Sequence, residues 1–171
     1  MSRSERRVDT PQGEARLVTD RARRPIATLL LSHGAGAGID TVDLEALAAH
    51  LPRNGITVIR LEQPWRVAGR RVATAPPTLD AALVAAANQL RTRTPLVVGG
   101  RSAGARSAAR CARRLGAGGC LALSFPLHPP GKPEKSRLDE LRGARVPTLV
   151  SNVRNNGPEL LEPLPLEEVA Q

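Results

Sequence analysis

Aromatic and cysteine residues are scarce in this sequence of 171 residues. It has no tyrosine, one tryptophan and one phenylalanine, so it lacks the stacking side chains with which proteins hold single-stranded nucleic acid. Two cysteines are too few for a disulfide scaffold, and we expect both to be reduced. The apolar fraction of 41% is too high for a disordered chain.

Long apolar runs are absent as well. No stretch approaches the roughly 18 residues of a membrane-spanning helix, so we expect no membrane partner. The basic N-terminus has no apolar segment behind it, which excludes a secretory signal. We therefore expect a cytoplasmic protein.

Lysine is the third scarce residue, because only two of the 25 basic residues are lysines. The formal net charge of +9 would favour a nucleic-acid partner. However, the arginines are spread along the chain, and an arginine-for-lysine, alanine-rich composition is what a GC-rich genome produces. We predict no nucleic-acid partner. The arginines best placed to attract an anion are Arg21, Arg23, Arg24, Arg66, Arg70 and Arg71.

Charge marks one boundary in the chain. Residues 1–150 are basic, whereas residues 151–171 contain one arginine and four glutamates. This last segment is rich in Asn, Pro and Glu and has no helical or strand period. We therefore predict one domain over 1–150 and a divergent, poorly ordered tail over 151–171.

The pattern of residues 1–150 predicts an α/β fold. Alternating residues on both sides of the turn at 10–13 predict an antiparallel hairpin over 5–20. After it, continuous apolar strands alternate with helices, which is typical of a doubly wound, mainly parallel sheet. The helix over 79–90 is expected to begin near Thr78 or Asp80. The expected strands are 26–31, 56–61, 95–99, 120–124 and 148–150, and the other expected helices are 41–51, 103–115 and 137–142.

The clearest motif is Gly100-Arg101-Ser102-Ala103-Gly104, which lies between a predicted strand and a predicted helix. A nucleophile elbow needs this context, because its sharp turn brings backbone segments close together and lifts the serine hydroxyl above the sheet. The pattern therefore predicts Ser102 as a nucleophile. The alternative is a serine that only caps the following helix.

A glycine-rich loop, His33 to Gly38, follows the predicted strand 26–31. A backbone amide near Ala35, together with the amide of Ala103, could form an oxyanion hole. The loop could instead be only a tight connection. A dinucleotide-binding loop is a further alternative, with Glu62 on a ribose, but that motif needs a glycine where Ile39 stands.

In combination these motifs resemble the α/β-hydrolase superfamily, and more narrowly its small dienelactone-hydrolase-like branch, which is related to a subunit of the NSL histone-acetyltransferase complex. The likeness covers roughly residues 8–150 and rests on residues 29–38, 99–106 and 124–135. It implies a serine hydrolase of ester or related acyl bonds. Ser102 would be the nucleophile, and a small acyl molecule the substrate. It implies no cofactor and no metal.

The resemblance ends after residue 150. The family's acid would fall near Asn156, no aspartate follows Asp139, and no histidine follows His128. We therefore expect a truncated or frame-shifted chain of low activity, with His128 as the remaining candidate base and His33 as a structural residue. A non-catalytic interaction module or defective fragment is the alternative.

A missing C-terminal segment would also expose part of the sheet. The strand over 148–150 would be an open edge, and the apolar face near Leu121 and Leu123 would lack a covering helix. We therefore expect self-association through this edge.

Overall fold

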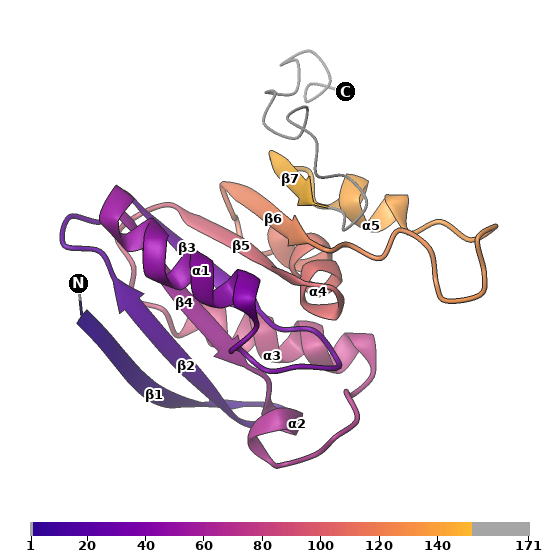
Figure 1. The fold of residues 1–171 in the computed structure, drawn as a ribbon, viewed down its shortest axis with the longest axis horizontal. Helices are drawn as coiled ribbons and strands as arrows, with labels where there is room; N and C mark the ends of the chain where they lie inside the picture. Colours follow the sequence, from indigo (N-terminus) through magenta and orange to yellow (C-terminus); the bar gives the residue numbers. More distant parts are fainter. Residues whose placement is uncertain (1, 152–171) are drawn as a thin grey trace.

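A seven-stranded sheet with helices on both faces organises residues 2–151, which are the residues that the computed structural model describes (Figure 1). Its strands are β1 (Ser2–Thr10), β2 (Gly13–Arg21), β3 (Ala27–Ser32), β4 (Ile56–Glu62), β5 (Leu96–Arg101), β6 (Gly119–Leu123) and β7 (Thr148–Ser151). Its helices are α1 (Val42–His50), α2 (Pro64–Val67), α3 (Pro76–Asn88), α4 (Ala103–Ala112) and α5 (Leu138–Gly143), with a 3₁₀ turn, η1 (Leu51–Asn54), after α1.

The strand order is β1-β2-β4-β3-β5-β6-β7. β1 and β2 form the predicted antiparallel hairpin, and β2 joins the sheet by pairing antiparallel with β4. Every later pair is parallel. The predicted α/β class, with a mainly parallel sheet and an N-terminal hairpin, is therefore confirmed.

Alternate residues of the central strands point to opposite faces, and each face has its own helices. In Figure 1, α1 lies in front of the sheet, whereas α3 and α4 lie behind it. Leu29 and Leu31 pack with Leu44 and Ala48 of α1. Leu30 belongs to the larger core on the opposite face, which includes the small residues of α3 and α4. Three consecutive positions of β3, 29–31, hold leucine because helices cover both faces of the sheet, so a polar residue is not favoured on either face.

Helix boundaries account for most differences from the sequence expectation. Neither Thr78 nor Asp80 caps α3, which starts earlier, with Ala75 as N-cap and Pro76 in the first turn. Proline suits this position because the N–H that it lacks would have no partner there. α1 ends at His50 and continues into η1, which ends before Gly55, whose φ of 82° fits a left-handed cap. The short helix α2, on the connection between β4 and α3, was not expected.

β7 is an edge strand of the described sheet, at the side opposite to β1. On the face that α1 covers elsewhere, Leu121 and Leu123 are only partly buried, and Leu149 is 54% exposed. The expected tail over 151–171 and Asn156 lie almost wholly outside the described residues. Self-association through this edge therefore stays a prediction. No helix within 2–151 has the length and apolarity needed to cross a bilayer.

Arginine–carboxylate pairs join the helices behind the sheet. Arg110 of α4 contacts Asp80 of α3 through two hydrogen bonds of 2.7 Å. Glu140 of α5 accepts hydrogen bonds from Arg106 at 2.6 Å and from Arg110 at 3.1 Å. Burial opposes ionisation of Glu140, but the two arginines outweigh it and lower the pKa of this carboxyl. Asp80 therefore serves as an ion-pair partner between helices and not as a cap.

We expect Glu140→Gln to reduce the free energy of unfolding by about 1–3 kcal/mol at pH 7, because the two arginines lose a charged acceptor. Since the folded-state pKa of Glu140 is lowered, its contribution is present above its ordinary pKa and is lost as pH falls through the folded value. Urea unfolding of both proteins at pH 7 and pH 3 measures this. A difference that is equally large at pH 3 would contradict the ionic origin. Asp139→Asn is the matched control, since Asp139 is exposed and lies 4.0 Å from Arg142.

Candidate active site

Ser102 lies at a sharp turn between β5 and α4, at the carboxyl edge of the parallel sheet. Its φ of 53° and ψ of −110° are rare for a residue with a side chain. Hydrogen bonds hold the turn on both sides, from Ser102 N to the Leu123 carbonyl at 2.9 Å and from Arg106 N to the Ser102 carbonyl at 3.1 Å. The expected strand-to-helix turn is therefore present. Ser102 occupies the N-cap position of α4, but its hydroxyl makes no capping hydrogen bond.

The glycines on either side of Ser102 allow two backbones to approach each other. A Cβ added at Gly100 or Gly104 would overlap the carbonyl oxygen of Ser32, at the end of β3. At Gly99, a Cβ would lie 2.7 Å from the carbonyl oxygen of Leu121. Packing against the neighbouring strands therefore explains why these positions hold glycine.

The glycine-rich loop after β3 lies beside this turn. A Cβ at Gly34 would come within 3.4 Å of the Ser102 Cβ and 3.3 Å of the Arg101 carbonyl oxygen. This follows from the pairing of β3 with β5, because adjacent parallel strands end at the same edge. Within residues 2–151, the backbone amides of Ala35 and Ala103 donate no hydrogen bond. One free amide therefore lies directly after the serine in the chain, and the other lies in the glycine-rich loop beside it.

His33 stands at the start of this loop, with both ring nitrogens occupied. Its Nδ1 lies 2.7 Å from the Gly34 carbonyl oxygen, so it carries the proton and donates. Its Nε2 accepts a hydrogen bond of 3.1 Å from the backbone N–H of Gln63. The residue is 2% exposed, and burial lowers its pKa. His33 therefore joins β3 to the end of β4 as a neutral imidazole, which leaves no nitrogen to take a proton from Ser102.

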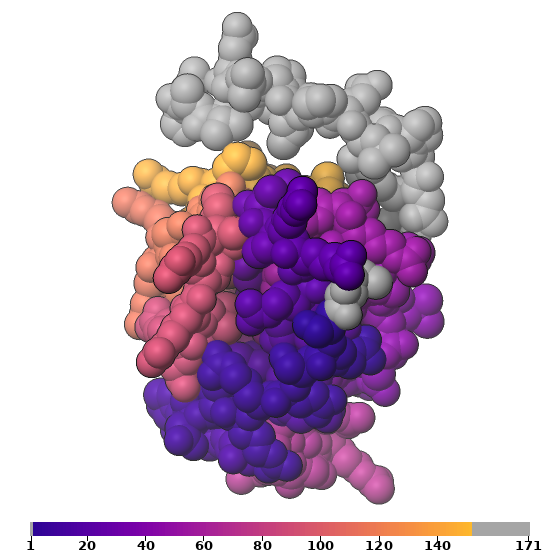
Figure 2. Space-filling view, turned by 90° about the vertical axis from the view of Figure 1, so that its left-hand side faces the viewer, coloured from indigo at the N-terminus to yellow at the C-terminus, as the bar shows by residue number. Residues whose placement is uncertain are grey.

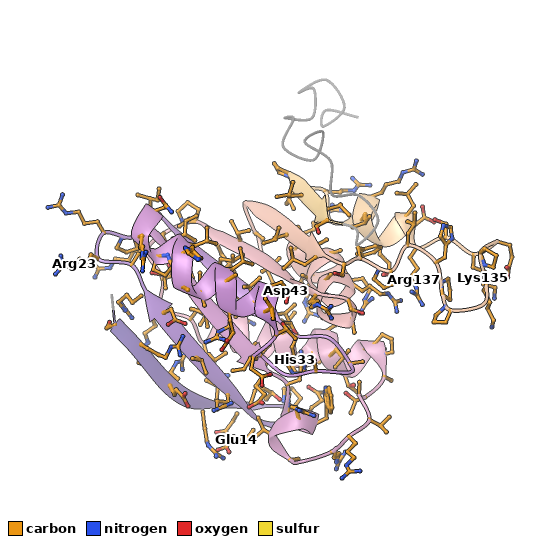
Figure 3. All side chains as sticks on the ribbon, in the orientation of Figure 1. Glu14, Arg23, His33, Asp43, Lys135 and Arg137 are labelled. Carbon is orange, nitrogen blue, oxygen red and sulfur yellow. The ribbon has the colours of Figure 1, made fainter. Side chains whose placement is uncertain are left out.

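His128, the candidate base, lies on the connection between β6 and α5. It is exposed, and its Nδ1 lies 2.8 Å from the Lys135 carbonyl oxygen, which leaves Nε2 free. No hydrogen bond joins His128 to Ser102 in the described part of the chain. Figure 3 shows Lys135 on a segment that projects away from the sheet, far from His33. The fold thus brings Ser102 and the glycine loop together, and His128 as the base stays a prediction.

An ion pair beside the elbow was not expected from the sequence. The Arg101 Nε lies 3.0 Å from the Asp43 Oδ2 in the first turn of α1. It ties the residue before Ser102 to the helix that follows the glycine loop. The sequence shows an arginine inside the Gly100–Gly104 motif, but nothing in the sequence indicates that Asp43 is its partner.

The remaining groups of possible chemical interest are inert or dispersed. Cys111 and Cys120 are buried and free, as expected for small core residues, and burial raises the pKa of each thiol to about 11. Within residues 2–151, no three His, Cys, Asp or Glu side chains gather in a way that could hold a metal ion.

Comparisons with known proteins give one family and several structures of the same fold. The model of a family described as alpha/beta hydrolase domain matches residues 25–155. A serine hydrolase homologue from Coxiella burnetii is similar with a TM-score of 0.71 at 14% identity, over 88% of this chain and 73% of that one. For a dienelactone hydrolase from Anabaena variabilis the TM-score is 0.69 at 16% identity, over 87% and 72%.

A third neighbour is a serine hydrolase without a lid from Xanthomonas campestris. It matches with a TM-score of 0.62 at 20% identity, over 74% of this chain. The present chain spans 63% of that protein's length. At such identities these likenesses show the fold. No curated protein matches the sequence.

The packing of the elbow makes Gly104→Ala a destabilising change. We expect it to reduce the free energy of unfolding by about 1–3 kcal/mol or more, because the added methyl group overlaps the Ser32 carbonyl. Gly36→Ala is the control, since a Cβ at Gly36 meets nothing within 4 Å. Urea unfolding of the two variants measures the contrast. Equal stabilities would mean that β3 and the elbow do not approach as described.

His33 predicts a loss of stability in mild acid. Because its pKa is lowered in the folded state, the unfolded chain binds the proton first as pH falls below about 6.5. The free energy of unfolding should then fall by up to about 1.4 kcal/mol per pH unit, and this slope should be smaller in His33→Gln.

Trp65 provides the signal for this measurement. It is the only tryptophan of the sequence, and its ring centroid lies 5.5 Å from that of His33. Its fluorescence can therefore follow urea unfolding between pH 7.5 and 5.5. A folded-state titration of His33 at or above pH 6.5, observed by NMR, would contradict the prediction.

Proposed function

Because this chain belongs to the family described as alpha/beta hydrolase domain, we propose that it is a serine hydrolase with Ser102 as nucleophile. Its substrate would be a small molecule with an ester or related acyl bond. One observation carries the proposal: Ser102 stands in a strained strand-to-helix turn, its hydroxyl makes no capping hydrogen bond to α4, and the glycine loop packs against its Cβ. A serine that only capped α4 would need neither feature.

The reaction follows from these positions. The Ser102 oxygen attacks the acyl carbon, and the carbonyl oxygen of the substrate gains negative charge in the tetrahedral intermediate. The free amides of Ala35 and Ala103 are the proposed donors to this oxygen. The amino end of α4, which begins at Ala103, adds a positive partial charge at the same place. The intermediate then expels the alcohol, which takes the proton that Ser102 has lost, and leaves an acyl-serine. Water hydrolyses this ester to the carboxylic acid and restores the serine hydroxyl.

The described site has no histidine hydrogen-bonded to Ser102 that could act as a general base. His33 has no free nitrogen, which leaves His128 as the candidate at this edge. In serine proteases the loss of the histidine costs on the order of a millionfold in kcat. An oxyanion hole and substrate binding alone leave roughly a thousand- to ten-thousandfold acceleration over water. We therefore propose slow hydrolysis by the present chain.

A non-catalytic interaction module is the second candidate function. The observation that favours it is the hydroxyl of Ser102, which hydrogen-bonds to no side chain within residues 2–151. An unactivated serine has its ordinary high pKa and attacks acyl groups slowly.

A fluorophosphonate probe and p-nitrophenyl acetate separate the two functions. We expect the probe to label wild-type protein, and Ser102→Ala to abolish both labelling and the enzymatic part of the hydrolysis. Ser4→Ala, an exposed serine on β1, is the control and should change neither. Labelling that is absent from folded wild-type protein, or unchanged in Ser102→Ala, would favour the non-catalytic module.

The role of His128 has its own test. If His128 is the base, His128→Ala lowers kcat by several orders of magnitude while labelling by the reactive probe only slows. His50→Ala is the matched control, because His50 ends α1 at the opposite edge of the sheet. A rate that depends on Ser102 but not on His128 would exclude His128 as the base.

A further inference from the structure

The connections at the amino edge of the parallel sheet, opposite to Ser102, carry charge of one sign. Each connection that leads into a parallel strand at this edge contains at least one arginine, and none contains Asp or Glu. In Figure 2, which views the molecule from the left-hand side of Figure 1, the indigo N-terminal strands and the rose segment around β5 lie side by side. Figure 3 shows Arg23 at this end, away from His33. These connections are residues 22–26, 51–55, 89–95, 113–118 and 144–147.

Helix ends explain some of these arginines but not all of them. Arg113 and Arg114 directly follow α4, where the negative end of the helix dipole favours a cation. Arg6 of β1 likewise donates to the carbonyl of Gln89, the C-cap residue of α3. Arg21, in contrast, ends β2, and Arg93 lies close to the start of β5. A ligand outside the chain would account for these two.

Part of this edge borders a hollow of about 880 Å³. Arg6, Arg21, Arg91 and Arg93 line it, and no Asp or Glu does. Arg6 donates one hydrogen bond, to the Gln89 carbonyl at 3.0 Å, which leaves most of its guanidinium N–H groups available. Within residues 2–151, none of the four forms a salt bridge with a carboxylate. Their positive charge is therefore not neutralised by the described protein.

Threonine hydroxyls form a polar wall of the same hollow. The Thr28 Oγ1 lies 3.0 Å from the Thr92 Oγ1 and 2.8 Å from the Thr94 Oγ1. Thr92 and Thr94 are themselves 2.8 Å apart. Thr28 is buried near the start of β3, whereas Thr92 is exposed and Thr94 half-buried on the connection into β5, so the wall joins the sheet to this connection.

We propose that this hollow binds a small molecule with more than one phosphate charge. Guanidinium groups match phosphate oxygens through paired N–H donors, and threonine hydroxyls can donate to the remaining oxygens. The volume lies within the range of small-molecule sites, about 300–1,000 Å³. Four arginines exceed what a single carboxylate would need. Because the hollow lies at the edge opposite to Ser102, the ligand is distinct from the acyl substrate.

A nucleic acid fits the hollow less well. Binding of single strands relies on aromatic stacking, and Trp65 and Phe125 are buried elsewhere in the fold. An anionic surface would contact exposed arginines along the whole edge and would not need a concave site with a hydroxyl wall.

Titration calorimetry with inorganic pyrophosphate, on the full chain at constant ionic strength, tests the proposal. The double variant Arg91→Gln/Arg93→Gln removes two charges from the hollow, and Arg113→Gln/Arg114→Gln removes two from the same edge outside it. We expect saturable binding to wild-type protein and about a tenfold or larger increase in Kd for the first variant. The second variant should bind as wild type does. All of these arginines are exposed, and circular dichroism verifies folding.

Three results would overturn the proposal. The first is no saturable binding of pyrophosphate to wild-type protein. The second is an equal loss of affinity in both double variants, which would show diffuse attraction by the whole edge. The third is tighter binding of a single-stranded RNA dodecamer or of phosphatidylserine vesicles than of pyrophosphate, which would make the edge a surface for a polyanion.

Discussion

The close approach of the β3 backbone to the elbow around Ser102, with no side chain between them, determines the geometry of the site. The carbonyl of Ser32 lies where a side chain at Gly100 or Gly104 would have to be. This contact sets β3 against the start of α4 and brings the glycine loop to the Cβ of Ser102. The position of the serine, the free amides around it and the unusual backbone angles all depend on this contact. A larger residue at either glycine would separate the parts of the site before it affected any reaction.

Arginine does two different jobs in the fold. Inside the structure it joins elements, as when Arg60, nearly buried on β4, donates to the Ile39 carbonyl at 2.8 Å and approaches Asp20 at 3.5 Å. Arg106 and Arg110 likewise join three helices through carboxylates. At the amino edge, the four arginines that line the hollow form no salt bridge with a carboxylate of the described residues.

The sequence predicted the sheet, the hairpin and the elbow well, because each depends on local pattern. Alternation around the turn at 10–13 and the glycines around Ser102 report constraints that act within a few residues. The start of α3 was misjudged because Asp80 looks like a cap, whereas its carboxylate is held by Arg110. Pairings such as Arg101 with Asp43 join positions that are far apart in the chain. No spacing rule links such residues. The same limit kept the sequence from showing that the threonines and arginines of the amino edge share one hollow.

The strand order β1-β2-β4-β3-β5-β6-β7 also constrains how the sheet can be assembled during synthesis. β5 pairs with β3, whose outer side is unpaired until β5 is made. β6 then pairs with β5, and β7 pairs with β6. Such strands can be added in the order in which they leave the ribosome. β4 is different, because it lies between β2 and β3 and pairs with both. Until the ribosome has made Ile56–Glu62, the hairpin has no ladder to the rest of the sheet. The hairpin therefore joins the sheet only through β4, whereas β5, β6 and β7 extend it outward in the order of the sequence.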